Sequence, residues 1–181
     1  MNISDILLDS ENANAISAIA RKFGLSEAQA HEAVASLIPS LNRGLQHRTK
    51  EEIGVNDILD ALGKGNHAKY LDEPERLEQQ ATTDDGNAIL GHIFGSKEVS
   101  RNVAKDAAAK TGIGSSLMKK LLPIVASMVM ASLSKKVFGG DSAPTTNQSE
   151  SGGLLTSLLD SDHDGSIIDD VLGMAFKVAF S

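Results

Sequence analysis

A largely apolar segment between Gly112 and Gly140 constrains the fold of this chain more than any other stretch. At 100° per residue, its few polar side chains and one proline share a narrow stripe, and leucine, isoleucine, valine and methionine occupy the rest of the circumference. The stripe consists of Ser116, Lys120, Pro123, Ser127 and Ser134. The sequence therefore predicts an all-α fold, a multi-helix bundle around a central apolar helix at about residues 112–138.

A membrane span is the alternative interpretation of this segment. Only fourteen residues separate Lys120 from Lys135, and they include serines and a proline. A helix that crosses a bilayer needs about 20 apolar residues. A helix lying in the membrane surface would have a broad and strongly basic polar face, which this one lacks. We therefore expect a core helix and no membrane association.

The composition is that of an ordinary globular protein, with 41% hydrophobic and 23% charged residues. Aromatic residues make up only 3%, which suits packing of helix on helix. There is no cysteine, so disulfides, thiolate catalysis and cysteine-bound zinc are excluded. The N-terminus has no basic region followed by a long apolar run, so it does not resemble a secretory signal. These features predict a cytoplasmic protein.

The net charge of -7 and the absence of a long lysine or arginine run argue against nucleic acid as a partner.

The clearest amphipathic helix is predicted to begin after Ser26, with Gln29 in the capping-box position. Its apolar residues recur three and four positions apart and form one face, and Pro39 lies opposite. The face consists of Ala30, Ala33, Val34, Leu37, Ile38, Leu41 and Leu45. This pattern predicts a helix that packs on the core by one side.

A degenerate helix-Gly-helix repeat is predicted within residues 1–138. Gly24 is followed by Pro39, and Gly112 by Pro123, at spacings that differ by about one helical turn. Between these two units, Gly91 and Gly95 are four residues apart, and we expect them to let a neighbouring helix approach closely.

The composition changes after Phe138. Residues 139–153 contain almost nothing to bury and are predicted to be a flexible linker. Residues 154–181 form a loop-helix tail, an acidic loop followed by an apolar helix, which should dock on its own domain or on a partner.

Residues Gly86 to Ser96, a valine- and alanine-rich helix after them, and the Leu-Leu-Pro sequence that ends at Pro123 resemble the YidB-like bacterial family of unknown function. The similarity covers roughly residues 1–138. The resemblance implies a small all-α bacterial protein. It implies no activity and transfers no functional residue.

No arrangement of residues supports catalysis. The segment from Gly91 to Lys97 has the glycines and lysine of a phosphate loop in the wrong order, so we interpret it as helix packing. His92 lies among apolar residues and is expected to be a hydrogen-bonded core histidine. A small basic cluster, Arg43, His47, Arg48 and Lys50, is expected to interact with the C-terminal dipole of its helix.

The acidic loop is the one stretch that resembles a site. Asp160, Asp162 and Asp164 occupy positions 1, 3 and 5 of an EF-hand calcium loop, Gly165 occupies position 6, and Ser166 would offer its carbonyl. Asp169 comes too early for the bidentate position 12, so calcium binding is expected to be weak. The alternative is a polar turn in which Ser166 caps the last helix and Asp169 completes a capping box.

The sequence thus predicts a non-enzymatic binding or regulatory module that contacts a protein partner, or a second copy of itself, through the C-terminal helix. An enzyme, a hydrolase or transferase with a cleft assembled from distant residues, stays open as the alternative.

Overall fold

The computed structural model describes residues 7–50, 52–64 and 67–138, together with Leu155 and Leu159. In chain order the elements are η1 Ser10–Asn12, α2 Ala13–Phe23, α3 Glu27–Thr49, α4 Glu52–Lys64, α5 Lys69–Asp72, η2 Pro74–Glu78, α6 Gln80–Phe94, α7 Lys97–Thr111 and α8 Ser115–Phe138, where η marks a 3-10 helix. No β-strand occurs in this part of the chain, and the all-α prediction is confirmed.

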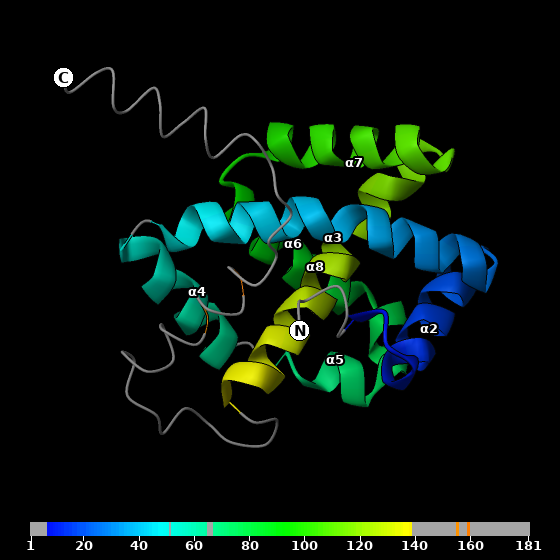
Figure 1. Ribbon diagram of the computed structural model, residues 1–181. Helices are drawn as coiled ribbons and strands as arrows, with labels where there is room; N and C mark the ends of the chain where they lie inside the picture. Colours follow the sequence, from blue (N-terminus) through cyan, green and yellow to red (C-terminus); the bar gives the residue numbers. More distant parts are fainter. Residues whose placement is uncertain (1–6, 51, 65–66, 139–154, 156–158, 160–181) are drawn as a thin grey trace.

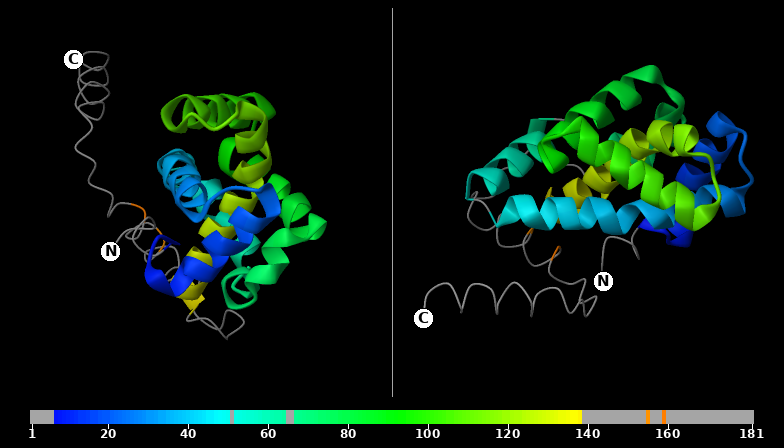
Figure 2. Two further views of the ribbon diagram at one scale, coloured as in Figure 1. Left: turned by 90° about the vertical axis from the view of Figure 1, so that its right-hand side faces the viewer. Right: turned by 90° about the horizontal axis from the view of Figure 1, so that it is seen from above.

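The apolar segment forms α8, the central helix of the bundle, as predicted. α8 contacts α3, α4, α5, α6 and α7, and it lies between α3 on one side and α6 on the other (Figures 1 and 2). Every residue from Leu121 to Ser134 is buried. By length and composition α8 could cross a membrane, but 78% of its most apolar window is buried against the other helices. That burial is what the core helix of a bundle requires.

The polar stripe of this helix is exposed only at its start. Ser116 and Lys120 are exposed, but Pro123, Ser127 and Ser134 are buried. The Oγ of Ser127 lies 3.1 Å from the carbonyl oxygen of Pro123 and 3.3 Å from that of Thr82, and either can accept its hydrogen. A serine satisfied in this way can be buried at little cost, so the stripe does not mark a face in water.

The close approach of α6 to α8 occurs at Gly86. A methyl group added at Gly86 would overlap the carbonyl oxygen of Pro123. The predicted role of Gly91 and Gly95 is wrong, because a methyl group at either would meet no atom within 4 Å. Gly95 instead ends α6 with φ of 65°.

The predictions for α3 are confirmed. Ser26 Oγ accepts a hydrogen bond from the backbone N–H of Gln29, and Gln29 Oε1 accepts one from the backbone N–H of Ser26, at 3.1 and 3.0 Å. All seven residues of the predicted apolar face are buried, and Pro39 is exposed.

The two predicted helix-Gly-helix units share one feature. α2 ends at Gly24 and α7 at Gly112, both with positive φ, at 64° and 72°. Their prolines differ, since Pro39 of α3 is exposed and Pro123 of α8 is buried. The repeat itself stays a prediction.

Two residues of the tail belong to the core of the bundle. Leu155 and Leu159 are fully buried in the same cluster as the α8 side chains. The carbonyl of Leu159 accepts a hydrogen bond from Nε2 of Gln46 on α3. The predicted linker and the remainder of the predicted tail lie outside the described residues.

Candidate functional site

A groove lies where the end of α6, the start of α7 and the start of α8 meet, and its volume is about 580 Å³. Leu90 and Leu122, both almost completely buried, supply its apolar surface. The other lining residues are polar, basic or glycine. They are Asn87, Gly91, Gly95, Ser96, Lys97, Ser100, Arg101 and Lys119.

Three cations and no carboxylate line this groove. Lys97 and Arg101 lie one turn apart on α7, so they share a face of that helix. Lys119 comes from the first turns of α8. None of the three forms an ion pair with any carboxylate of the described residues. We call Lys97, Arg101 and Lys119 the groove cations.

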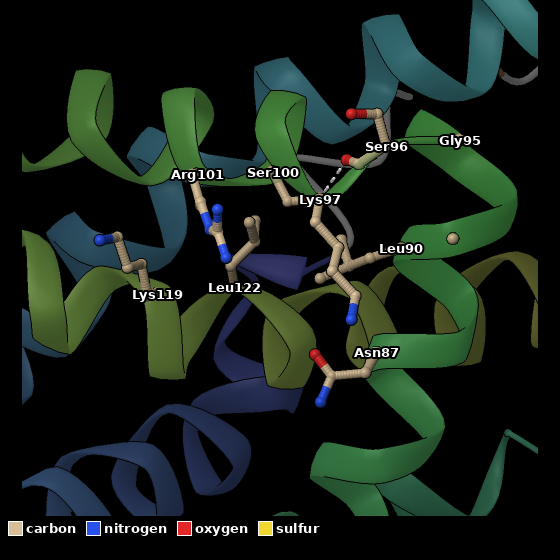
Figure 3. A pocket seen from close by; sticks show the side chains of 10 residues that line it. Asn87, Leu90, Gly95, Ser96, Lys97, Ser100, Arg101, Lys119 and Leu122 are labelled. Atoms are coloured by element: carbon tan, nitrogen blue, oxygen red, sulfur yellow. Dashed lines mark hydrogen bonds between the residues drawn. The ribbon is translucent and has the colours of Figure 1, made fainter.

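The directions of these side chains are visible in Figure 3. Lys97 and Arg101 both extend from α7 across the groove toward α6 and α8, and Lys119 stands at one end. Asn87 projects from α6 on the side of the groove toward which Lys97 extends (Figure 3). Ser100 Oγ donates back to the carbonyl of Ser96 at 3.3 Å, which keeps that hydroxyl on its own helix. The groove therefore presents positive charge beside a small apolar surface, and it can hold an anionic group.

A helix cap and a glycine turn define where α7 starts, and this start carries Lys97 and Arg101. Ser96 caps the helix by accepting a hydrogen bond from the backbone N–H of Glu98 at 3.1 Å. The left-handed Gly95 immediately before it turns the chain from α6 into α7. The sequence predicts only helix packing for the segment from Gly91 to Lys97, and in the structure this segment also forms a wall of the groove. The lysine and arginine four residues apart were the available signal, but nothing in the sequence indicates that Lys119 lies beside them.

A second polar cluster joins α4, α5 and α6 around His67, which is 2% exposed. The Nε2–H of His67 donates to the carbonyl of Ala61 at 3.0 Å. Its Nδ1 lies 3.1 Å from Oδ2 of Asp85, although not in the alignment of a good hydrogen bond. Tyr70 donates its hydroxyl hydrogen to the same oxygen at 2.7 Å.

This cluster resembles a catalytic histidine–aspartate pair in composition but not in access. In such a pair the nitrogen facing away from the carboxylate takes the proton of the reacting group. Here that nitrogen, Nε2 of His67, is occupied by the Ala61 carbonyl, and the ring is buried. The arrangement therefore connects helices. Burial, followed by the hydrogen bond to Asp85, raises the pKa of Tyr70 above its ordinary value, so the phenol stays protonated and donates.

The predicted role of His92 is wrong, because this side chain is exposed. Among the histidines that the structure describes, His67 is the buried one, and its polar surroundings in the sequence give no sign of this. Of the predicted basic cluster, His47 and Arg48 lie in the last turn of α3, where cations interact favourably with the helix dipole. Arg48 also lies 3.8 Å from Asp57 of α4.

The predicted calcium ligands Asp160, Asp162, Asp164, Ser166 and Asp169 lie outside the described residues. Among the residues that the structure describes, no group of three or more histidine, aspartate or glutamate side chains could hold a metal ion.

A family model described as "Bacterial protein of unknown function (DUF937)" matches residues 5–136, which include all ten residues of the groove. The chain belongs to this family. Membership agrees with the resemblance to the YidB-like proteins. No curated protein and no solved structure matches the chain. The family description states no activity.

Proposed function

We propose that this member of the family is a non-enzymatic binding module that holds an acidic segment of a protein partner in the groove between α6, α7 and α8. One observation carries the proposal. The groove cations line one concave surface and have no carboxylate partner among the described residues. A cation held beside low-dielectric protein surface interacts more strongly with an incoming anion than one in open water.

The apolar floor of the groove is compatible with a peptide as ligand. Leu90 and Leu122 are 6% and 2% exposed, so they offer a small contact to an aliphatic side chain between the carboxylates of a bound segment. Nucleic acid fits less well, because its affinity rests on neutralising many phosphates and single strands also need aromatic surfaces for stacking. The groove has three cations and no aromatic residue among those that line it.

The enzyme alternative has less support. A hydrolase or transferase needs a nucleophile next to a base, or a metal. Among the groove residues the nucleophile candidates are Ser96 and Ser100, which hydrogen-bond within α7. No histidine, aspartate or glutamate lines the groove to serve as a base.

The test is calorimetric titration of the full-length protein with a short poly-aspartate peptide at low salt. Lys97→Glu/Arg101→Glu should weaken binding at least tenfold, or about 1.4 kcal/mol. Lys105→Glu/Lys110→Glu is the matched control, since it makes the same change of charge farther along α7 at exposed positions outside the groove. Binding should also weaken as salt increases.

Equal loss of affinity in both double variants would mean that net charge, and not the groove, attracts the peptide. A single-stranded oligonucleotide that binds wild type more tightly than poly-aspartate does, and loses that affinity in Lys97→Glu/Arg101→Glu, would assign the groove to nucleic acid instead.

A further inference from the structure

We infer that the partner segment held in the groove is extended, with acidic side chains at every second position and small aliphatic side chains between them. This inference rests on the proposed function and names the ligand class of the same site. Four features of the groove support it, namely the spacing of Lys97 and Arg101, the difference between its walls, its size and the free amide of Asn87.

The two cations of α7 match the repeat of an extended chain. Lys97 and Arg101 are four residues apart, and a helix rises about 1.5 Å per residue, so their positions are ~6 Å apart along α7. In an extended segment, side chains two residues apart point to the same side and are about 6.6 Å apart. Alternate acids can therefore meet Lys97 and Arg101 at the same time, whereas adjacent acids point to opposite sides.

The walls of the groove differ in a way that suits this alternation. α7 supplies Lys97 and Arg101, and the other two walls, α6 and α8, supply Leu90 and Leu122 (Figure 3). A segment extended along α7 between these walls turns alternate side chains toward the cations and the remaining ones toward the leucines. Because Leu90 and Leu122 are almost completely buried, the apolar contact is small, and a short aliphatic side chain such as valine is enough to make it.

The size of the groove also fits an extended segment. One residue of a strand takes a space of about 3.3 by 4.8 by 10 Å, so a volume of about 580 Å³ holds roughly four residues. Four residues supply two acids for the two cations of α7 and two aliphatic side chains for the two leucines. A helix is about 10–12 Å thick and fills the same volume with roughly one turn, which is not stable by itself.

Asn87 offers a contact that favours an extended backbone. Its side-chain amide can both donate and accept hydrogen bonds, and it has no hydrogen-bond partner among the described residues. It projects from α6 on the side of the groove toward which Lys97 extends. The interior of a helix pairs its own N–H and C=O groups, but those of a single extended segment remain available. Asn87 can therefore bind one peptide unit of the segment.

The test compares two hexapeptides of equal composition and charge, by calorimetric titration of the full-length protein at low salt. In one, aspartate and valine alternate, and in the other three aspartates precede three valines. Both are acetylated and amidated, so their ends carry no charge. The alternating peptide should bind about tenfold more tightly, because two of its acids meet α7 together. Asn87→Ala should weaken binding of this peptide about threefold, since one hydrogen bond is lost.

Two variants that each remove one positive charge separate the spacing of the cations from their number. Arg101→Gln interrupts the pair on α7, so the preference for the alternating peptide should fall below about threefold. Lys119→Gln is the matched control, since Lys119 belongs to α8 and stands at one end of the groove. It should weaken both peptides to a similar extent and keep the tenfold preference. A preference that falls equally in both variants would contradict recognition by Lys97 and Arg101 as a pair.

Failure of this inference is distinguishable from failure of the proposed function. Equal affinity of the two peptides for wild type, with both lost in Lys97→Glu/Arg101→Glu, would overturn the alternating ligand and leave the groove as a site for acidic segments. Peptide binding that is unaffected by Lys97→Glu/Arg101→Glu would overturn the proposed function itself. Unchanged affinity of the alternating peptide for Asn87→Ala would contradict recognition of an extended backbone.

Discussion

Gly86 of α6 packs directly on the carbonyl of Pro123 in α8, so closely that a single methyl group at Gly86 would overlap the carbonyl oxygen. This contact joins the helix that carries Asn87 and Leu90 to the helix that carries Lys119 and Leu122. It therefore sets the separation of two of the three walls of the groove.

Gly86→Ala should destabilise the bundle by about 1–3 kcal/mol, because the added methyl group has to displace backbone and not a flexible side chain. Gly91→Ala is the matched control on the same helix, where a methyl group meets no atom within 4 Å. It should stabilise the protein by up to about 1 kcal/mol, since alanine is the better helix former. Thermal unfolding followed by circular dichroism measures both. A Gly86→Ala protein that melts with wild type would show that the helices can separate freely.

Val125 tests the burial of α8. It is fully buried, so Val125→Asp places an unpaired charge in the core at a cost of several kcal/mol, out of a total stability on the order of 5–15 kcal/mol. The domain should unfold. Val99→Asp makes the same change at a valine that is 42% exposed, and it should leave the melting temperature nearly unchanged. Equal melting of the two variants would mean that α8 is accessible to water.

The sequence predicted the bundle well where a helix has one apolar face that packs on the core and one polar face in water. The spacing from Ala30 to Leu45 identified the buried side of α3, because the exposed side of that helix carries polar residues. The spacing of polar residues is less informative for α8, where Ser127 is buried with its hydroxyl satisfied by carbonyl groups. Periodicity records which residues are polar, but not whether the fold supplies them with a hydrogen-bond partner.

The groove could be predicted only in part. Lys97 and Arg101 are four residues apart and share a helix face, which is visible in the sequence. The position of Lys119 near them, and the fact that no carboxylate of the described residues pairs with them, depend on how α7 packs on α8. The prediction for His92 is wrong for a similar reason, since apolar neighbours in sequence indicate burial but the packing of α6 leaves this side chain exposed.

Tyr70 gives a direct test of the buried cluster. Its pKa is raised by burial and by the bond to Asp85, so folding favours the protonated phenol. That contribution to stability is complete below the unfolded pKa of about 10 and is lost as pH rises through the higher folded pKa. The chain has one tyrosine and no tryptophan, so tyrosinate absorbance reports Tyr70 alone. Its titration should lie at higher pH in the folded protein than in denaturant, and Asp85→Asn should shift it down. A midpoint that is the same with and without denaturant would contradict the described environment.

The calcium loop stays a prediction from sequence. Three alternating aspartates, Asp160, Asp162 and Asp164, repel one another unless a cation neutralises them, and the missing glutamate at position 12 predicts a dissociation constant on the order of 10⁻⁴ to 10⁻³ M. Calorimetric titration with calcium should show weak binding that is lost in Asp160→Ala/Asp164→Ala. Absence of heat at millimolar calcium, or identical heat from the double variant, would leave Ser166 as a helix cap.

The central claim is that acidic segments bind in the groove between α6, α7 and α8, and its most direct test is to locate the bound peptide. Amide NMR spectra of the full-length protein should be recorded during titration with poly-aspartate. The largest shifts should fall at Asn87, at Ser96 to Arg101 and at Lys119, and they should disappear in Lys97→Glu/Arg101→Glu. Shifts centred instead on the basic end of α3, at Arg43 to Lys50, would contradict the account.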